Sequence, residues 1–224
     1  MPTYEQLGFG EGAALSGDRA RTVFGHVMGL VAVSLGFAAL GAWILRNQAG
    51  GTGIIFFIGA FACVFGLQGA AARGHEQLAT GLLFGMALLL GMAISPIVVY
   101  YAKTNPGVVY EAAGSTALFV GALGSFGYAT RRDLTGYVKP FLIAFGVLFL
   151  FGLITLFVAI PGSNIIYCVG MLVVFGGFTV FDFNRLATSG QYSSAVPIAA
   201  GIFLDIFNVF LLLLSLFGGG NQRR

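Results

Sequence analysis

Two aspartates stand in long apolar stretches of the sequence. Asp182 lies in VFGGFTVFDFNRL and Asp205 lies in GIFLDIFNVFLLLL. An acidic residue near the centre of a membrane helix costs roughly 2.5–3.5 kcal/mol on insertion scales, and such residues usually face the protein interior or water. Carboxylates in close contact share a proton, because neighbouring charges in a poor dielectric resist ionising together. The pair is a candidate proton sensor or cation site. The alternative is that each aspartate is a structural polar group bonded to a hydroxyl or an amide.

The composition indicates that these aspartates belong to a membrane protein. Hydrophobic residues make up 58% of the chain and charged residues only 8%, and the mean hydropathy is +0.92. Soluble domains carry about 25% charged residues, so this chain cannot cover a water-facing surface. The net charge of +3 comes from Lys and Arg residues scattered singly or in pairs, which is not typical of a nucleic-acid-binding face.

Seven apolar segments approach the ~20 residues that a helix needs to cross ~30 Å of hydrocarbon. They lie at about 23–45, 53–72, 78–101, 108–129, 138–160, 164–186 and 196–217. The sequence therefore predicts an all-α, integral membrane seven-helix bundle over residues 23–217, with the seventh helix near its centre. A short cytoplasmic segment, 1–22, precedes the bundle, and a short tail, 218–224, follows it.

The basic residues predict the orientation of this bundle. The side of the N-terminus carries Arg19, Arg21, Arg73, Arg131, Arg132, Lys139 and Arg185. The other side carries Arg46 and Lys103, with Arg223 and Arg224 in the tail. Cytoplasmic loops of membrane proteins are enriched in Lys and Arg. We therefore expect a protein of the cell (inner) membrane with its N-terminus in the cytoplasm and its C-terminus outside.

This topology brings the two aspartates to the same side of the membrane. Asp182 lies roughly 6 Å from the cytoplasmic edge and Asp205 roughly 14 Å from it, at 1.5 Å per residue. Two basic residues could pair with them at that face. Arg73 ends the second apolar segment, and Arg185 follows Asp182 by one helical turn. A cytoplasmic anchor is the simpler interpretation of Arg185.

Two further polar residues are candidates for supporting roles. Glu111 begins the fourth apolar segment on the outer side, where it could line an outer vestibule or stabilise a helix N-terminus through the helix dipole. Asn208 follows Asp205 by three residues and is a candidate polar support for it. Two glycine pairs spaced four apart, Gly25/Gly29 and Gly81/Gly85, are expected to allow close packing between helices of the chain.

Four stretches together resemble the Bax-inhibitor family of seven-helix membrane proteins, in a prokaryotic form. They are LDIFNVFLLLL at 204–214, FDFNRL at 181–186, EAAGSTALFVGALGSFGYATRRDL at 111–134 and MAISPIVVYYA at 92–102. The resemblance implies a pH-sensitive calcium leak. It implies that Asp182 and Asp205 form a hydrogen-bonded pair, with Arg73 as the latch partner of Asp182 and Glu111 as the family glutamate. Calcium is then the candidate ion at the two aspartates, and no cofactor is expected.

The chain also departs from the family pattern. A single arginine precedes Gly74 where relatives often have several basic residues, and the tail GGGNQRR lacks the charged run of animal members. Some bacterial members instead modulate a membrane-bound AAA protease. A non-transporting regulator that binds such a protease, or other membrane proteins, is therefore the alternative function.

Enzymatic functions fit the sequence poorly. Intramembrane aspartyl proteases also use two membrane-embedded aspartates that share a proton, but they carry YD, GxGD and PAL motifs. Here Asp182 follows Phe181, Asp205 follows IFL, and no PAL comes after it. The GSFG at 124–127 is not the GxSxG of a serine hydrolase. We therefore expect a protein that is not an enzyme and whose partners are the lipid bilayer, calcium and protons.

Overall fold

The structure is a computed structural model that describes residues 8–47, 53–130, 132, 134–158, 162–188 and 194–219. Its helices are α1 Gly8–Ile44, α2 Gly53–Ala72, α3 Glu76–Thr104, α4 Pro106–Ala129, α5 Val138–Phe157, α6 Ser163–Thr188 and α7 Val196–Gly219. A 3-10 turn, η2, covers Thr135–Tyr137 before α5. The described part of the chain contains helices and no strand.

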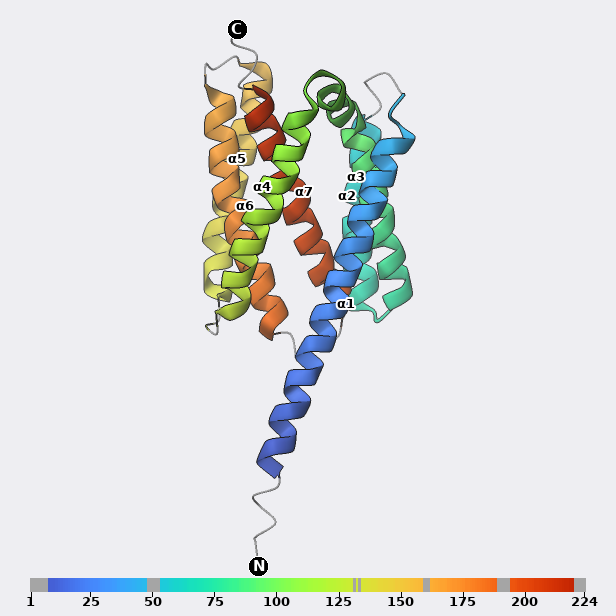
Figure 1. Cartoon of the computed structure of the whole chain (residues 1–224), viewed down its shortest axis with the longest axis vertical. Helices are drawn as coiled ribbons and strands as arrows, with labels where there is room; N and C mark the ends of the chain where they lie inside the picture. The colour runs from blue at the N-terminus through green and yellow to red at the C-terminus, as the bar shows by residue number, and fades with distance from the viewer. Residues whose placement is uncertain are drawn as a thin grey trace, which may run out of the picture.

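The predicted all-α membrane bundle is confirmed. Within the described residues, seven helices are long and apolar enough to cross a membrane, and the first of these spans covers Arg21–Ile44. α1 itself begins earlier, at Gly8, so residues 8–20 of the expected N-terminal segment are helical and extend away from the bundle (Figure 1). The expected tail begins inside α7, and residues 220–224 lie outside the described part of the chain.

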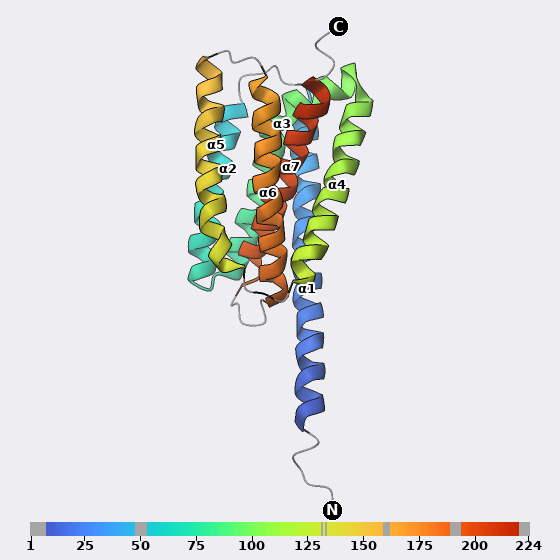
Figure 2. The same cartoon turned by 90° about the vertical axis from the view of Figure 1, so that its left-hand side faces the viewer.

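The bundle has two groups of helices with α7 between them (Figures 1 and 2). One group is α1, α2 and α3, the other is α4, α5 and α6, and α7 contacts α1, α2, α3, α4 and α6. In an apolar stretch of 18 residues within α7, half of the residues are buried. The corresponding share is 17% in α2 and 0% in α5. The seventh helix is therefore the centre of the bundle, and it can bury polar side chains that an outer helix would expose to lipid.

Successive helices run in opposite directions, which gives the bundle two distinct ends. We call the end from which residues 8–20 extend the N-side, and the opposite end the C-side (Figure 1). Arg21, Arg73, Lys139 and Arg185 lie at the N-side. Arg46 lies at the C-side with its guanidinium 4.2 Å from the ring centre of Trp43.

α1 and α3 are in direct backbone contact. A Cβ added to Gly41 would collide with the carbonyl oxygen of Leu88, and one added to Gly91 would collide with the carbonyl oxygen of Ala38. One turn after Gly91, the Ser95 hydroxyl donates a hydrogen bond of 2.7 Å to the carbonyl of Ala42. Small residues permit such an approach, and an interhelical hydrogen bond strengthens it in lipid.

The glycine pairs that the sequence indicated do not form this contact. A Cβ added to Gly25, Gly29, Gly81 or Gly85 would meet no atom of the described chain within 4 Å. The expectation that they pack closely within the chain is wrong, because spacing along one helix does not say which of its faces meets a neighbour.

We predict that Gly91→Ala destabilises the bundle, because the new methyl group meets a backbone carbonyl that cannot rotate away. Overpacking of this kind costs about 1–3 kcal/mol. The matched control is Gly85→Ala on the same helix, which gains helix propensity and meets open space. Thermal unfolding of the purified protein in detergent compares the two. Equal unfolding temperatures for both variants would contradict the α1–α3 contact.

Candidate functional site

The two aspartates come from adjoining helices, near the N-side. Asp182 is six residues before the end of α6 and Asp205 is nine residues after the start of α7. Asp182 is therefore about 9 Å from the N-side end of α6, and Asp205 is about 14 Å from the N-side end of α7. α6 and α7 pack against each other, and the two carboxyl groups are close enough to interact electrostatically.

Asp205 is enclosed by the bundle. Its side chain is only 4% exposed, and its Oδ2 has no hydrogen-bond partner among the described residues. A buried acceptor that lacks a partner costs about 1–3 kcal/mol, and more when it is charged. Such an atom is stabilised either by protonation of the carboxyl group or by a ligand that comes to it.

Thr179 is the polar side chain that faces Asp205 from α6. Its hydroxyl lies within hydrogen-bonding reach of the Asp205 carboxyl and donates a 2.8 Å hydrogen bond to the carbonyl of Phe175. A threonine hydroxyl has one hydrogen and two acceptor lone pairs. Because the hydroxyl has a single hydrogen, it cannot donate fully to Phe175 and to Asp205 at the same time, and it can accept from Asp205 when that group is protonated.

Asp182 lies against the backbone of α7. A Cβ added to Gly201 would collide with Oδ2 of Asp182. Gly201 precedes Asp205 by four residues, and Thr179 precedes Asp182 by three, so each pair shares one face of its helix. These faces meet, and Gly201 provides the space in which the Asp182 carboxyl group sits beside Asp205.

The cation that acts on Asp182 in the structure is Arg185. It is half-buried and one turn further along α6, where the sequence favoured an anchoring role. Arg73, the latch partner implied by the family resemblance, is exposed at the end of α2. Its Nη1 lies 4.0 Å from where a Cβ of Gly69 would be, so the side chain folds back along its own helix.

Glu111 lies toward the other end of the bundle from this acid pair, and Asn208 uses its amide on its own helix. Glu111 is exposed in the second turn of α4, toward the C-side, whereas Asp182 is near the N-side (Figure 1). Asn208 is half-buried, and its amide donates a 2.7 Å hydrogen bond to the carbonyl of Leu204 on its own helix.

Asn184 is a structural residue that no motif or spacing in the sequence distinguishes. It is 3% exposed, and its amide nitrogen donates to the carbonyls of Gly127 and Thr130, at 3.4 and 2.6 Å. It thereby adds a second hydrogen bond at the Gly127 carbonyl, which already accepts from the Thr130 N–H, and satisfies the Thr130 carbonyl just beyond the end of α4. At the same place, a Cβ on Gly127 would collide with the carbonyl of Val180. These contacts fix α4 against the half of α6 that carries Asp182.

The acid pair supplies few protein ligands for a metal ion. Among the described residues, no group of three His, Cys, Asp or Glu side chains is placed to hold one. Calcium takes six to eight oxygen ligands, of which two carboxylates supply at most four.

Fold and site together define a class: a seven-helix membrane protein with a pair of carboxyl groups between its last two helices. The family model described as "Inhibitor of apoptosis-promoting Bax1" matches residues 20–223. The chain therefore belongs to the Bax inhibitor family, and the resemblance seen in the sequence is confirmed.

The chain is also similar to several bacterial proteins. It is 29% identical to the uncharacterised protein YrjE of Lactococcus lactis over 92% of this chain and 94% of that one. It is 26% identical to the inner membrane protein YbhL of Escherichia coli, over 88% and 92%. An uncharacterised membrane protein of Streptococcus pyogenes is 31% identical over 66% of both chains.

We predict that Gly201→Ala destabilises the protein and that Asp182→Ala relieves this effect. The added methyl group collides with the Asp182 carboxyl group, so removing that group restores space. Overpacking costs about 1–3 kcal/mol, and the interaction energy between contacting positions falls in the range of about 0.5–3 kcal/mol. A double-mutant cycle on thermal unfolding in detergent measures it. Additive effects of the two substitutions would place the Asp182 carboxyl group elsewhere.

Proposed function

We propose that this protein is a pH-sensitive calcium-leak channel of the cell membrane, gated by Asp182 and Asp205. The observation that carries the proposal is the buried Asp205 carboxyl group, whose Oδ2 has no hydrogen-bond partner in the described part of the chain and which lies beside a second carboxyl group. Membrane-embedded acids that face the interior of a bundle commonly mark ion or proton pathways. In this proposal the protein performs no chemical reaction, and calcium is its cargo.

The gate depends on how many charges the pair carries. With one proton or more, the carboxyl groups remain side by side between α6 and α7. When both lose their protons, two negative charges in a poor dielectric repel each other. Arg185 compensates part of this charge at Asp182. The rest of this electrostatic repulsion is not compensated at Asp205. It favours separation of α6 and α7 and entry of water between them.

The apolar side chains around the second half of α7 support a closed state. Val209, Leu212 and Leu214 are buried on the C-side of Asp205, at 0, 8 and 0% exposure. An ion that reaches the acid pair from the N-side would meet this apolar barrier next. In the open state, water and backbone carbonyls supply the oxygens that two carboxylates cannot, since calcium needs six to eight.

The orientation is also a proposal. We infer that the N-side faces the cytoplasm, because the N-side carries the greater share of the basic residues and cytoplasmic loops are enriched in them. The acid pair then senses cytoplasmic pH.

Calcium entry into liposomes tests the gate. We expect the flux through the wild-type protein to rise as the pH increases, because deprotonation charges the pair. Asp205→Asn cannot acquire this charge and should lose the pH dependence, as should Asp182→Asn. The matched control is Glu76→Gln, which removes an exposed carboxylate in the first turn of α3 and should keep the pH dependence.

Two results would count against this function. A flux no greater than that of empty liposomes at every pH would refute the channel and favour the non-transporting regulator. A flux with the same pH dependence in both Asn variants would keep the leak but refute the gate.

The same assay identifies the basic partner of Asp182. Removing a positive charge near a carboxylate makes its ionisation harder, so Arg185→Gln should move the half-maximal flux to higher pH. Arg73→Gln should leave the midpoint in place, because the charge that acts on Asp182 in the structure is that of Arg185. A shift with Arg73→Gln alone would instead support the latch that the family resemblance implies.

A further inference from the structure

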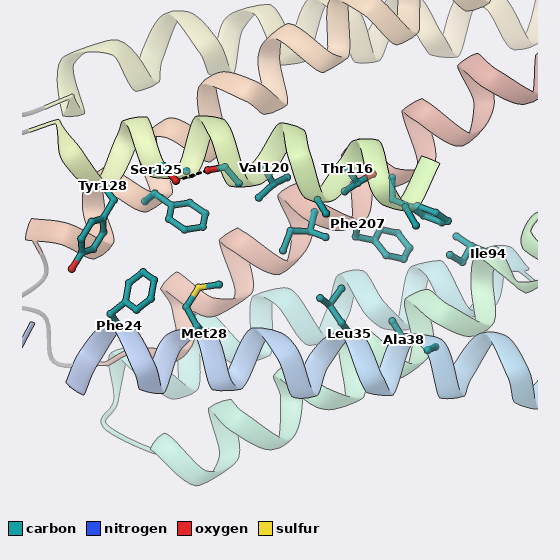
Figure 3. Close-up of a pocket in the computed structure, with 18 of the residues that line it drawn as sticks. Phe24, Met28, Leu35, Ala38, Ile94, Thr116, Val120, Ser125, Tyr128 and Phe207 are labelled. Carbon is teal, nitrogen blue, oxygen red and sulfur yellow. Dashed lines mark hydrogen bonds between the residues drawn. The ribbon is translucent and has the colours of Figure 1, made fainter. Parts of the chain in front are cut away.

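A large cavity separates α1 from α4. Its volume is about 1010 Å³, and Phe183, Ile206 and Phe207 of α6 and α7 form its floor. Figure 3 shows Phe24, Met28, Leu35 and Ala38 of α1 on one side, with Thr116, Val120, Ser125 and Tyr128 of α4 on the other. Because α1 and α4 both cross the membrane, an occupant of this cavity lies within the thickness of the bilayer. We call it the α1–α4 groove.

The lining of the α1–α4 groove is hydrocarbon along most of its length, with few polar groups. The aliphatic hydroxyl groups of Thr116 and Ser125 are already used within α4. Thr116 donates to the carbonyl of Ala112 at 2.7 Å, and Ser125 donates to that of Gly121 at 2.6 Å. The remaining lining is aliphatic, aromatic or glycine, apart from Arg21 and the Tyr128 hydroxyl. The occupant must therefore be apolar over most of its length.

The N-side end of the groove is different, because it is charged and aromatic. Arg21 lines the groove there and is exposed. One turn further, the rings of Phe24 and Tyr128 meet edge to face with their centres 5.1 Å apart. Aromatic residues of this kind are typical of the membrane interface, and a basic residue near that level attracts anionic lipid headgroups.

The length of the groove also fits a lipid. The lining residues of α1 run from Arg21 to Ala42, about 31 Å of helix, which matches the ~30 Å hydrocarbon thickness of a bilayer. One leaflet, which is half of this thickness, therefore extends from Arg21 to about the level of Val31.

We propose that the α1–α4 groove binds an anionic phospholipid of the N-side leaflet. One acyl chain lies between α1 and α4, the headgroup phosphate lies at Arg21, and the second chain remains in the bilayer. The buried chain packs on Phe183 and Ile206, the residues that directly follow Asp182 and Asp205 in the sequence. The bound lipid thus supports the outer face of the helix pair that carries the two carboxyl groups.

Native mass spectrometry of the full-length protein tests this binding. The protein in detergent is equilibrated with phosphatidylglycerol or phosphatidylcholine, and the retained lipid is counted after mild activation. We expect the wild type to retain one phosphatidylglycerol. Gly121→Phe should reduce retention about tenfold or more by filling the groove. A Cβ at Gly121 meets no atom within 4 Å, so the ring projects into open space. Gly114→Phe is the matched control on α4, with the same open surroundings outside the groove, and should bind as the wild type does.

Arg21→Gln tests the headgroup contact separately. It should reduce the preference for phosphatidylglycerol over phosphatidylcholine about fivefold, the contribution of one basic residue near an anionic surface. The matched control is Arg46→Gln at the C-side, which should keep the preference. Equal retention by Gly121→Phe and Gly114→Phe would overturn the proposal. So would a wild type that retains no lipid, or one that retains a second polypeptide which Gly121→Phe releases.

Discussion

The contact between α6 and α7 at the two carboxyl groups is the constraint on which the rest of the structure depends. Asp205 is almost completely buried, and one of its oxygens has no partner among the described residues. A position on an outer helix would expose this group to lipid, where the cost is several kcal/mol. The helix that carries it is therefore the centre of the bundle, enclosed by both groups of helices. Gly201 and Thr179 complete the arrangement, one by giving Asp182 space and the other by facing Asp205 with a hydroxyl.

The contacts around this pair differ in what they hold fixed. Asn184 bonds to the end of α4 and fixes that helix to the N-side half of α6. Gly91 and Ser95 fix α3 to α1 on the other side of α7. Between these two tightly packed units lies the α1–α4 groove, with α7 at its floor. Movement of the α4–α6 unit against the α1–α3 unit would therefore shift α7 and change the contact between Gly201 and Asp182.

The sequence predicts the architecture and the acid pair because both follow from the cost of polarity in lipid. Long apolar segments predict the seven helices, and Asp182 and Asp205 stand out since hydrocarbon penalises their charge. The supporting residues could not be found in this way. Gly41 and Gly91 are two of 35 glycines, and only the observed crossing distinguishes them from Gly25 or Gly81. Arg185 and Arg73 are equally basic in the sequence, and the side-chain directions favour Arg185 as the partner of Asp182.

The central claim is that the buried pair holds a proton while the helices are packed together. Infrared difference spectroscopy of the protein in lipid measures this directly, through the carbonyl stretch of a protonated carboxylic acid. We expect this band to be present at neutral pH in the wild type, to disappear on alkalinisation, and to be missing from Asp205→Asn. Glu76→Gln should retain the band. A wild-type spectrum without a carboxylic acid band at neutral pH would contradict a protonated pair.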